Sequence, residues 1–374
     1  MVSRQLTLLP GGACLGQAGD IARGIMINLS STLSFYPALA MHYHVSLKFT
    51  PDRISREAIL DQGRNVLDAE TSALAQLSQS LDEEFARAVE LILASKGRVV
   101  VSGMGKSGHI ARKMAATFAS TGTPAIFIHP GEAAHGDLGM LLADDLLVML
   151  SNSGATPELK AIQNYASRLG CAIIAITSQR HSPMGTAANA CITLPKVSES
   201  CPLNISPTTS TTLMLALGDA LAIAVMSVRG ISREQLEQLH PGGAIGSRLM
   251  PINEIMHVGD AVPLVAADLP MRDVLVTMTE KSLGLAGVVD ASGHLLGAIT
   301  DGDLRRGIDQ VLSCVAADMM TANPKTIPDG TFAEDALAIM TANKITALFI
   351  MDHAVPERPI GVVHIHDFNR LGLR

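Results

Sequence analysis

The sequence predicts an α/β protein in which a parallel sheet flanked by helices is followed by a duplicated α/β unit. Three observations carry this prediction. Short β-rich apolar runs alternate with helix-like segments between residues 98 and 177, a glycine-rich turn directly follows the first run, and one pattern recurs at a fixed spacing after residue 251. At 374 residues, with 48% hydrophobic and 17% charged residues, the chain is long enough for two or three packed domains.

Four apolar runs have the character of strands in a parallel sheet. They are "RVVVS" from Arg98, "AIFIH" from Ala125, "DLLVML" from Asp145 and "CAIIAIT" from Cys171. Near-continuous apolar strands between helices are typical of a sheet that is covered on both faces. Because ligands bind beyond the carboxyl ends of such strands, we expect a site in the segments that follow these runs.

The residues before the first strand divide into two parts. Residues 52–95 carry apolar residues at helical spacing, which predicts helical structure with an apolar face. The residues of this face are Ile59, Val66, Leu67, Leu74, Leu77 and Leu81. Residues 1–50 lack the ordered charged, apolar and cleavage regions of a secretory signal, so we treat them as an N-terminal extension without an assigned function.

The turn "GMGKSGH" follows the first predicted strand. Gly103, Gly105 and Gly108 match the dinucleotide-binding pattern, while Gly105, Lys106 and Ser107 resemble the end of a P-loop. A P-loop needs a further glycine at position 100, where valine stands, and dinucleotide binding needs an acidic residue where the next strand ends in "IHP". What remains is a helix N-terminus that presents free N–H groups to an anion such as phosphate, or else a sharp turn without a ligand.

A second strand-to-helix turn, "SNSGATPE", follows "DLLVML". Ser151, Ser153 and Thr156 place three hydroxyls where a helix begins. Such residues commonly serve only as helix caps. Two anion-binding turns in one parallel sheet nevertheless favour a phosphosugar pocket over a dinucleotide cleft.

A repeat of 64 residues (361 − 297) occupies the C-terminal third of the chain. Each copy reads as helix, strand, turn, strand and helix, and a unit this small must bury its apolar face against its twin. The matching pairs are Gly297 and Gly361, Asp303 and Asp367, and Arg306 and Arg370. A duplicated packing module that binds nothing and a nucleotide-sensing module are both consistent with this pattern.

Composition and charge exclude several classes of function. A formal net charge of -7 without a Lys/Arg-rich block gives no electrostatic basis for binding nucleic acid. The five cysteines are scattered without a C-x-x-C pair, which is typical of reduced thiols in the cytoplasm. We count no apolar run longer than a strand, so we expect no membrane span and a cytoplasmic protein.

Four segments and the repeat together resemble the arabinose 5-phosphate isomerase family over roughly residues 52–374. The segments are "GMGKSGHIARKMAATFASTGTPAIFIHPGEAAHGDLGM", "SNSGATPE", "SESCPLNISPTTSTT" and "LHPGGAIGSRL". The resemblance implies a sugar isomerase (SIS) domain with a flavodoxin-like, doubly wound sheet at 51–250, followed by CBS domains at 251–312 and 313–374. It implies interconversion of D-ribulose 5-phosphate and D-arabinose 5-phosphate without a cofactor, which supplies Kdo, an acidic sugar of the lipopolysaccharide or capsule.

The resemblance also implies a set of site residues. The catalytic residues carried over by motif are Lys106, Glu158, Glu199 and His240. The expected substrate-binding residues are Gly105, Ser107, Ser151, Ser153, Thr156 and His135, and we favour substrate contact over a metal site for the last of these. The family commonly has glutamate where this chain has Ala155, which bears on substrate selectivity.

The chemistry of an aldose–ketose isomerase needs these residue types. A proton must move between C1 and C2 through an enediol, so a carboxylate must take it from one carbon and return it to the other. A cation stabilises the charge that develops on oxygen. We assign the base to Glu199, the cation to Lys106 and proton transfer between oxygens or ring opening to His240, with Glu158 positioning His240 or the substrate.

Two other functions remain open at the level of sequence. One is a non-catalytic phosphosugar-sensing regulator whose CBS domains respond to nucleotides, although a pure sensor needs no base. The other is an amino-sugar phosphate isomerase or deaminase of the same fold. In each case we expect a nucleotide or sugar nucleotide at the CBS pair. We also expect a homo-oligomer, because the predicted helix at 211–228 is apolar nearly all round and needs burial on more than one face. The resemblance implies that this oligomer is a homotetramer.

Overall fold

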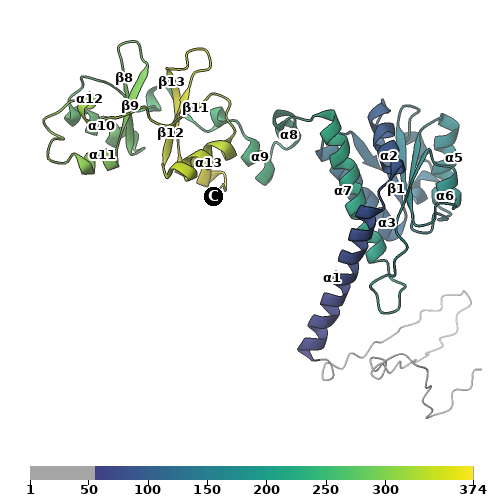
Figure 1. Ribbon diagram of the computed structural model, residues 1–374. Helices are drawn as coiled ribbons and strands as arrows, with labels where there is room; N and C mark the ends of the chain where they lie inside the picture. Colours follow the sequence, from purple (N-terminus) through teal and green to yellow (C-terminus); the bar gives the residue numbers. More distant parts are fainter. Residues whose placement is uncertain (1–54, 374) are drawn as a thin grey trace, which may run out of the picture.

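The computed structural model describes residues 55–373, and the predicted extension at 1–50 lies outside this range. Figure 1 shows two lobes, a sheet domain and the duplicated unit, joined by two short helices. These helices are α8 (Arg233–Leu239) and α9 (Gly243–Leu249). The two parts that the sequence predicts are therefore separate domains.

The first domain is built on a five-stranded parallel sheet with the order β2-β1-β3-β4-β5. Its strands are β1 (Val99–Gly103), β2 (Ala125–Phe127), β3 (Leu146–Leu150), β4 (Ile173–Thr177) and β5 (Ala190–Thr193). The order is that of a flavodoxin-like doubly wound fold, as predicted. The first four strands were predicted from the sequence and β5 was not, because only three consecutive apolar residues, 190–192, stand between Asn189 and Thr193.

Alternate residues of each strand enter the two cores of this domain. Val99 and Val101 pack with one set of helices, while Val100 between them packs with the other set. The first set is α1 (Arg56–Gln79), α2 (Glu83–Ala94), α3 (Gly105–Ser120) and α7 (Thr209–Arg229). The second set is α4 (Pro130–Ala133), α5 (Leu159–Leu169) and α6 (Pro183–Thr186), with the short 3-10 turn η3 (Asp137–Met140) beside them.

The helical pattern predicted for residues 52–95 is present as two helices, and its apolar face is less buried than the pattern suggests. The chain breaks into α1 and α2 because the Asp82 side chain accepts a hydrogen bond from the Glu84 backbone N–H and starts a new helix. The predicted apolar face is also largely unpaired, since Ile59 and Leu67 are 58% and 65% exposed. Figure 1 shows the reason, because the first half of α1 extends beyond the domain and has nothing within the described chain to pack on.

Helix α7 runs alongside α3 in the same direction. A Cβ atom on Gly218 would lie 2.6 Å from the Met114 side chain, and Arg229 at the end of α7 donates to Thr123 Oγ1 at 2.9 Å, just beyond the end of α3. By length and composition α7 is apolar enough to cross a membrane, so the expectation that every apolar run is strand-sized is wrong. Its buried residues pack in the first core, as those of a core helix do.

The duplicated unit contains two four-stranded sheets, with the orders β10-β9-β8-β7 and β11-β12-β13-β6. Copy 1 contains β7 (Leu264–Ala266), α10 (Met271–Lys281), β8 (Leu285–Val289), β9 (Leu295–Thr300) and α11 (Asp301–Arg306). Copy 2 contains β11 (Thr326–Pro328), α13 (Ala333–Asn343), β12 (Ala347–Met351), β13 (Pro359–His364) and α14 (Ile365–Arg370). The predicted helix, strand, strand, helix order is present in both copies.

Each copy lends a short strand to the sheet of the other. Strand β6 (His257–Val258) precedes copy 1 but pairs with β13, while β10 (Thr321–Ala322) precedes copy 2 but pairs with β9. The remaining connecting elements are η4 (Ile252–Glu254), η5 (Gly259–Ala261) and α12 (Ala316–Met319). An apolar cluster that includes Leu285 and Phe349 joins the two sheets, which is the burial against a twin that the repeat predicts.

Candidate active site

The two predicted anion-binding turns lie side by side. Strands β1 and β3 are neighbours in register, with Gly103 opposite Leu150, so the turns that follow them share one edge of the sheet. Helix α3 begins at Gly105, and its N-cap residue Met104 makes no side-chain capping bond. The first N–H groups of α3 are therefore available at this edge, with Lys106 exposed beside them.

Steric crowding explains why the first turn needs its glycines. A Cβ atom on Gly108 would lie 2.5 Å from the Gly103 carbonyl oxygen, so strand and helix meet at backbone contact distance. Gly105 has a φ of 58°, a conformation that L-residues with side chains rarely adopt. The glycines thus serve a sharp turn, and that turn is also what exposes the helix N-terminus.

The serine-rich turn, residues 151–156, is a compact set of hydroxyl groups. Ser151 Oγ lies 2.7 Å from Thr156 Oγ1 and 3.4 Å from Ser153 Oγ, and it accepts a hydrogen bond from the Gly154 N–H at 3.0 Å. Ser151 is buried, whereas Glu158 just before α5 is exposed. Three hydroxyls that converge in this way suit the oxygens of a phosphate group.

Glu199 lies in the loop between β5 and α7. Its Oε2 accepts hydrogen bonds from Thr208 N at 2.7 Å, Thr208 Oγ1 at 3.2 Å and Ser210 N at 3.2 Å, so it caps the start of α7. Partial burial raises the pKa of this carboxyl, but the hydrogen bonds from Ser210 and Thr208 outweigh burial and hold the pKa below its usual value. Glu199 is therefore ionised at neutral pH and fixed in orientation.

His240 is not brought to this edge of the sheet. It follows α8, and its Nδ1 lies 2.8 Å from the Leu236 carbonyl oxygen. Glu199 sits at the start of α7, whereas α8 begins just after the end of α7, and a helix of this length spans about 30 Å. Within one chain, His240 and Glu199 cannot contact the same small sugar.

Two histidines lie closer to the candidate site. His135 follows α4 beyond the carboxyl end of β2 and is exposed. His129 is the second residue after the same strand, and its Nδ1 is buried without a hydrogen-bond partner among residues 55–373. His129 was not among the residues predicted from the sequence. Within the described chain, no three His, Cys, Asp or Glu side chains gather closely enough to hold a metal ion.

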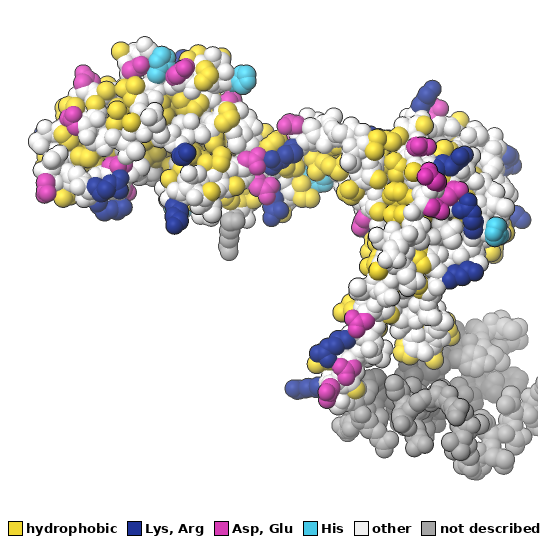
Figure 2. Space-filling view, in the orientation of Figure 1, with side chains coloured by type: hydrophobic (Ala, Val, Ile, Leu, Met, Phe, Trp, Pro, Cys, Tyr) yellow, Lys and Arg dark blue, Asp and Glu magenta, His cyan; other side chains and the backbone are white. Residues whose placement is uncertain are grey.

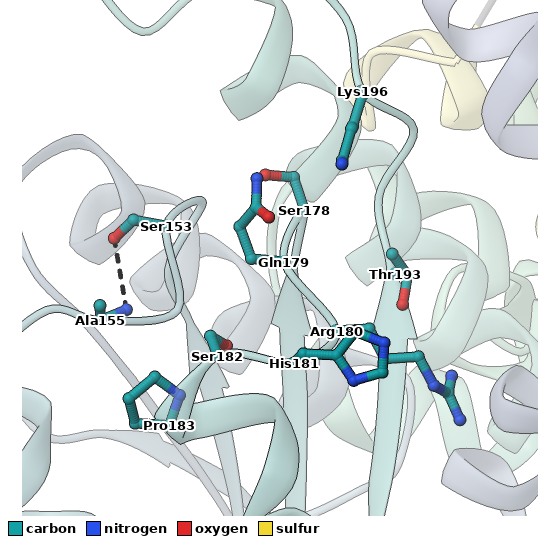
Figure 3. Close-up of a pocket in the computed structure, with 10 residues that line it drawn as sticks. All are labelled: Ser153, Ala155, Ser178, Gln179, Arg180, His181, Ser182, Pro183, Thr193 and Lys196. Atoms are coloured by element: carbon teal, nitrogen blue, oxygen red, sulfur yellow. Dashed lines mark hydrogen bonds between the residues drawn. The ribbon is translucent and has the colours of Figure 1, made fainter.

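Two adjoining cavities open at the carboxyl edge of the sheet. The larger, about 410 Å³, lies among the loops after β3, β4 and β5 and is drawn in Figure 3. The smaller, about 310 Å³, is lined by Asn152 and Ser210 and shares Ser178, Gln179 and Lys196 with the first. None of the four predicted catalytic residues lines either cavity.

Sequence reasoning missed Gln179 and Lys196, which line both cavities. Gln179 is the second residue after the predicted strand "CAIIAIT", where a ligand-binding position is expected, but a lone glutamine carries no pattern. Lys196 follows β5, the strand that was not recognised. The position of a residue after a strand was thus the available signal for both.

Comparison with known proteins gives matches to both parts of the chain. The family model of the SIS domain matches residues 92–224, and that of the CBS domain matches 252–310 and 315–373. A structure of an Escherichia coli CFT073 protein in complex with arabinose 5-phosphate is 36% identical, and the match covers 50% of this chain and 100% of that chain with a TM-score of 0.49.

Curated relatives match over nearly their whole length. Arabinose 5-phosphate isomerase KdsD of Yersinia pestis is 46% identical over 317 residues, covering 83% of this chain and 95% of the relative. KdsD of Pseudomonas aeruginosa is 43% identical, covering 84% and 97%, and KdsD of Escherichia coli K12 is 44% identical, covering 83% and 95%. This chain belongs to the arabinose 5-phosphate isomerase family.

Proposed function

We propose that this protein interconverts D-ribulose 5-phosphate and D-arabinose 5-phosphate in the cytoplasm and so supplies Kdo for lipopolysaccharide or capsule. The observation that carries the proposal is the match to KdsD proteins across both the SIS domain and the CBS pair. The adjacent glycine and serine-rich turns support it, because they offer N–H groups, hydroxyls and Lys106 to one phosphosugar.

In the proposed reaction the substrate phosphate binds across the two turns, held by N–H groups of Gly105 and Ser107 and by hydroxyls of the serine-rich turn. Glu199 takes the proton from C1 of the ketose and returns it to C2, while a second proton passes from O1 to O2 of the enediol. Lys106 stabilises the charge that develops on oxygen. The capping bonds on Oε2 support this role, because they fix the carboxylate and keep it ionised.

We propose that the protein is a homo-oligomer and, as the resemblance to the family implies, a tetramer. The positions of His240 and of several exposed apolar residues support an oligomer. If His240 acts on the substrate held near Glu199, it must come from a second copy of the chain, because α7 separates the two residues within one chain. Apolar side chains are also exposed on α1 and α7, namely Ile59, Leu60, Leu67, Ile223 and Val228. In Figure 2 hydrophobic side chains lie exposed over α7 and along the protruding part of α1.

The CBS pair is proposed to bind a nucleotide or sugar nucleotide that regulates the SIS domain. The helices that join the two parts support such coupling. Arg233 of α8 pairs with Asp335 of copy 2 at 2.7 Å and lies over the Phe332 ring, 4.6 Å from its centroid. Helix α8, which connects the two domains, therefore packs on the CBS pair.

Incubation of the purified full-length protein with ribulose 5-phosphate, followed by NMR of the aldose, tests the proposal. We expect arabinose 5-phosphate to appear without added cofactor. Lys106→Ala should lower kcat/KM about ten-fold or more, because the ammonium stabilises both the bound phosphosugar and the developing charge. Lys96→Ala, an exposed lysine at the opposite edge of the sheet, is the matched control. Binding of the sugar phosphate without any turnover would favour the non-catalytic sensor.

A further inference from the structure

His240 lies in the segment of α8 and α9, residues 233–249, which joins the two domains. Among residues 55–373, no hydrogen bond or ion pair links this segment to the SIS domain, and no residue of it enters either core of that domain. Ile231, just before the segment, still packs on the SIS domain, since a Cβ atom on Gly122 would lie 3.0 Å from its side chain. The hydrogen bonds and core packing of the SIS domain therefore end by residue 231.

Side chains at both ends of this segment are paired with copy 2 of the CBS pair. At the first end, the Arg233 guanidinium lies 2.7 Å from Asp335 and 3.7 Å from Glu334, and it stacks over the Phe332 ring. At the other end, Arg248 Nε lies 4.0 Å from Glu334. Exposed ion pairs are individually weak, so the two acids of α13 hold the segment by several contacts at once.

The backbone attaches the end of α9 to copy 2 as well. Residues 250–252 pair with residues 331–333, at the start of α13, through two hydrogen bonds of 2.8 Å. In copy 1 the equivalent residues 314–316, which follow at the repeat distance of 64 (314 − 250), pair in the same way with residues 269–271. This pairing is therefore part of the CBS fold, and α9 runs directly into it. In Figure 1 α9 lies beside α13.

His240 is fixed between the two helices of the segment. A Cβ atom on Gly246 of α9 would lie 2.2 Å from the His240 carbonyl oxygen, so α9 packs on the His240 backbone at contact distance. On the other side, His240 Nδ1 lies 2.8 Å from the Leu236 carbonyl oxygen of α8. A displacement of either helix therefore displaces His240.

We propose that α8, α9 and copy 2 move as one unit about the chain at residues 230–232, so that the CBS pair controls the position of His240. Gly230 ends α7 with a φ of 64°, and α8 begins only three residues later, at Arg233. The inference rests on the proposed function, in which His240 of one chain acts on the substrate held near Glu199 of another. A ligand of the CBS pair in one chain would then regulate the active site of a second chain.

Hydrogen–deuterium exchange of the full-length protein, read by peptide mass spectrometry, tests whether the unit exists. The double variant Glu334→Gln/Asp335→Asn keeps the side-chain shapes and removes both charges. We expect amides in residues 233–249 to exchange about five-fold faster in this variant, with no change in α7. Arg233→Gln breaks the same contacts from α8 and should have a similar effect. Unchanged exchange in β12, a buried strand of copy 2, verifies that both variants fold.

Asp273→Asn is the matched control. Asp273 is the third residue of α10 in copy 1, as Asp335 is the third residue of α13 in copy 2. It is exposed and makes no ion pair within the described part of the chain, so this variant should leave exchange in residues 233–249 unchanged. All three variants should keep the parent kcat, because none changes a residue that we assign to catalysis.

A second experiment tests whether the unit couples the two domains. Coupling between two sites is reciprocal, so a substrate that engages His240 must also act on copy 2. With arabinose 5-phosphate added to the parent protein, we expect exchange to slow about five-fold both in residues 233–249 and in residues 331–336. In Glu334→Gln/Asp335→Asn the sugar phosphate should still protect residues 233–249, while most of the protection at residues 331–336 is lost.

Two results would overturn the inference. One is exchange in residues 233–249 that is the same in the parent, the double variant and Arg233→Gln. The other is protection of residues 233–249 by the sugar phosphate without any change at residues 331–336. In both cases the isomerase function would still stand. Faster exchange in the two variants, in a protein that does not turn the sugar phosphate over, would support the unit and count against the proposed function.

Discussion

Glu199 in the SIS domain and Asp303 in the CBS pair use the same local device with different consequences. Each carboxylate accepts backbone N–H groups at the start of a helix. Asp303 is 7% exposed, and its two oxygens accept from Thr300 N, Thr300 Oγ1, Arg306 and Thr321 at 2.6–2.9 Å. The hydrogen bonds to Glu199 all end on Oε2, and its side chain is less buried.

The surroundings of a carboxylate, and not the capping motif, decide what it can do. Glu199 lies on a loop at the carboxyl edge of a parallel sheet, where ligands bind. Asp303 lies at a corner between a hairpin and α11, where its donors come from the fold itself. We therefore predict a chemical role for Glu199 and a structural role for Asp303, and each can be tested separately.

The largest expected effect is that of Glu199→Gln. The amide has nearly the same shape and can still accept at the start of α7, but it cannot accept a carbon-bound proton. We expect kcat to fall about 100-fold or more, with little change in the thermal midpoint. Glu90→Gln, an exposed carboxylate on α2, is the matched control. If Glu199→Gln unfolds the domain without slowing the folded fraction, Glu199 is a cap and nothing more.

The converse effect is expected for Asp303→Asn. Burial raises the pKa of Asp303, but hydrogen bonds from Thr300, Thr321 and Arg306 hold the pKa below its usual value. Its stabilisation is therefore present at neutral pH and is lost as the pH falls below about 4. We expect the substitution to cost the CBS pair about 1–3 kcal/mol of unfolding free energy at pH 7 and to reduce its acid sensitivity. Isomerase turnover should not change.

Denaturant unfolding at pH 7 and pH 3 measures both parts of this prediction. Asp309→Asn serves as the control, since Asp309 is exposed and makes no hydrogen bond among the described residues. An Asp303→Asn protein that is as stable as the control, or that has reduced turnover, would contradict a purely structural role for Asp303.

A smaller effect concerns the thiol in the Glu199 loop. Backbone N–H groups of Ile205, Ser206 and Leu203 lower the pKa of Cys201 to about 7, whereas burial raises the pKa of Cys171 and Cys191. At pH 7 we expect iodoacetamide to alkylate Cys201 roughly ten-fold faster than the two buried thiols, with a half-maximal rate near pH 7. Peptide mass spectrometry after timed quenching measures this. Equal rates at all three thiols would mean that the loop does not hold the described conformation.

The smallest effect is expected from removal of the CBS pair. Every residue that we assign to catalysis precedes Met250, so a chain that ends there should keep its turnover and lose only regulation. The cut exposes Arg233 of α8 and the face of α9 that packs on α13, so solubility must be checked by gel filtration. A folded, oligomeric truncated protein without activity would show that the CBS pair helps to form the active site.

Patterns with a physical period made the fold predictable. Apolar strands with alternate faces and a 64-residue repeat identified both parts of the molecule. The exchange of β6 and β10 between the copies was not predictable, because a two-residue strand is defined only by its partner. The break between α1 and α2 was not predicted for a similar reason. The residue that caps α2, Asp82, is a single position within a helical pattern.

The candidate site was predictable where residues follow a strand in a recognisable turn, as Lys106 and Ser151 do. Such motifs do not indicate how far apart two residues lie in the folded chain. His240 carries a family motif as strong as that of Glu199, yet the length of α7 keeps the two apart within one chain. Lys196 was not predicted because β5 was not recognised as a strand. Only the structure shows that the nearby Arg180 pairs with Glu84, whereas Lys196 makes no ion pair among the described residues.

Exchange of the C2 proton of arabinose 5-phosphate with deuterated solvent, followed by NMR, tests most directly whether Glu199 is the base. We predict that the parent protein and Asp303→Asn exchange this proton at the same rate, and that Glu199→Gln exchanges it at least about 100-fold more slowly while still binding the sugar phosphate. Exchange at the parent rate in Glu199→Gln would contradict this assignment and pass the role of base to Glu158 or a histidine.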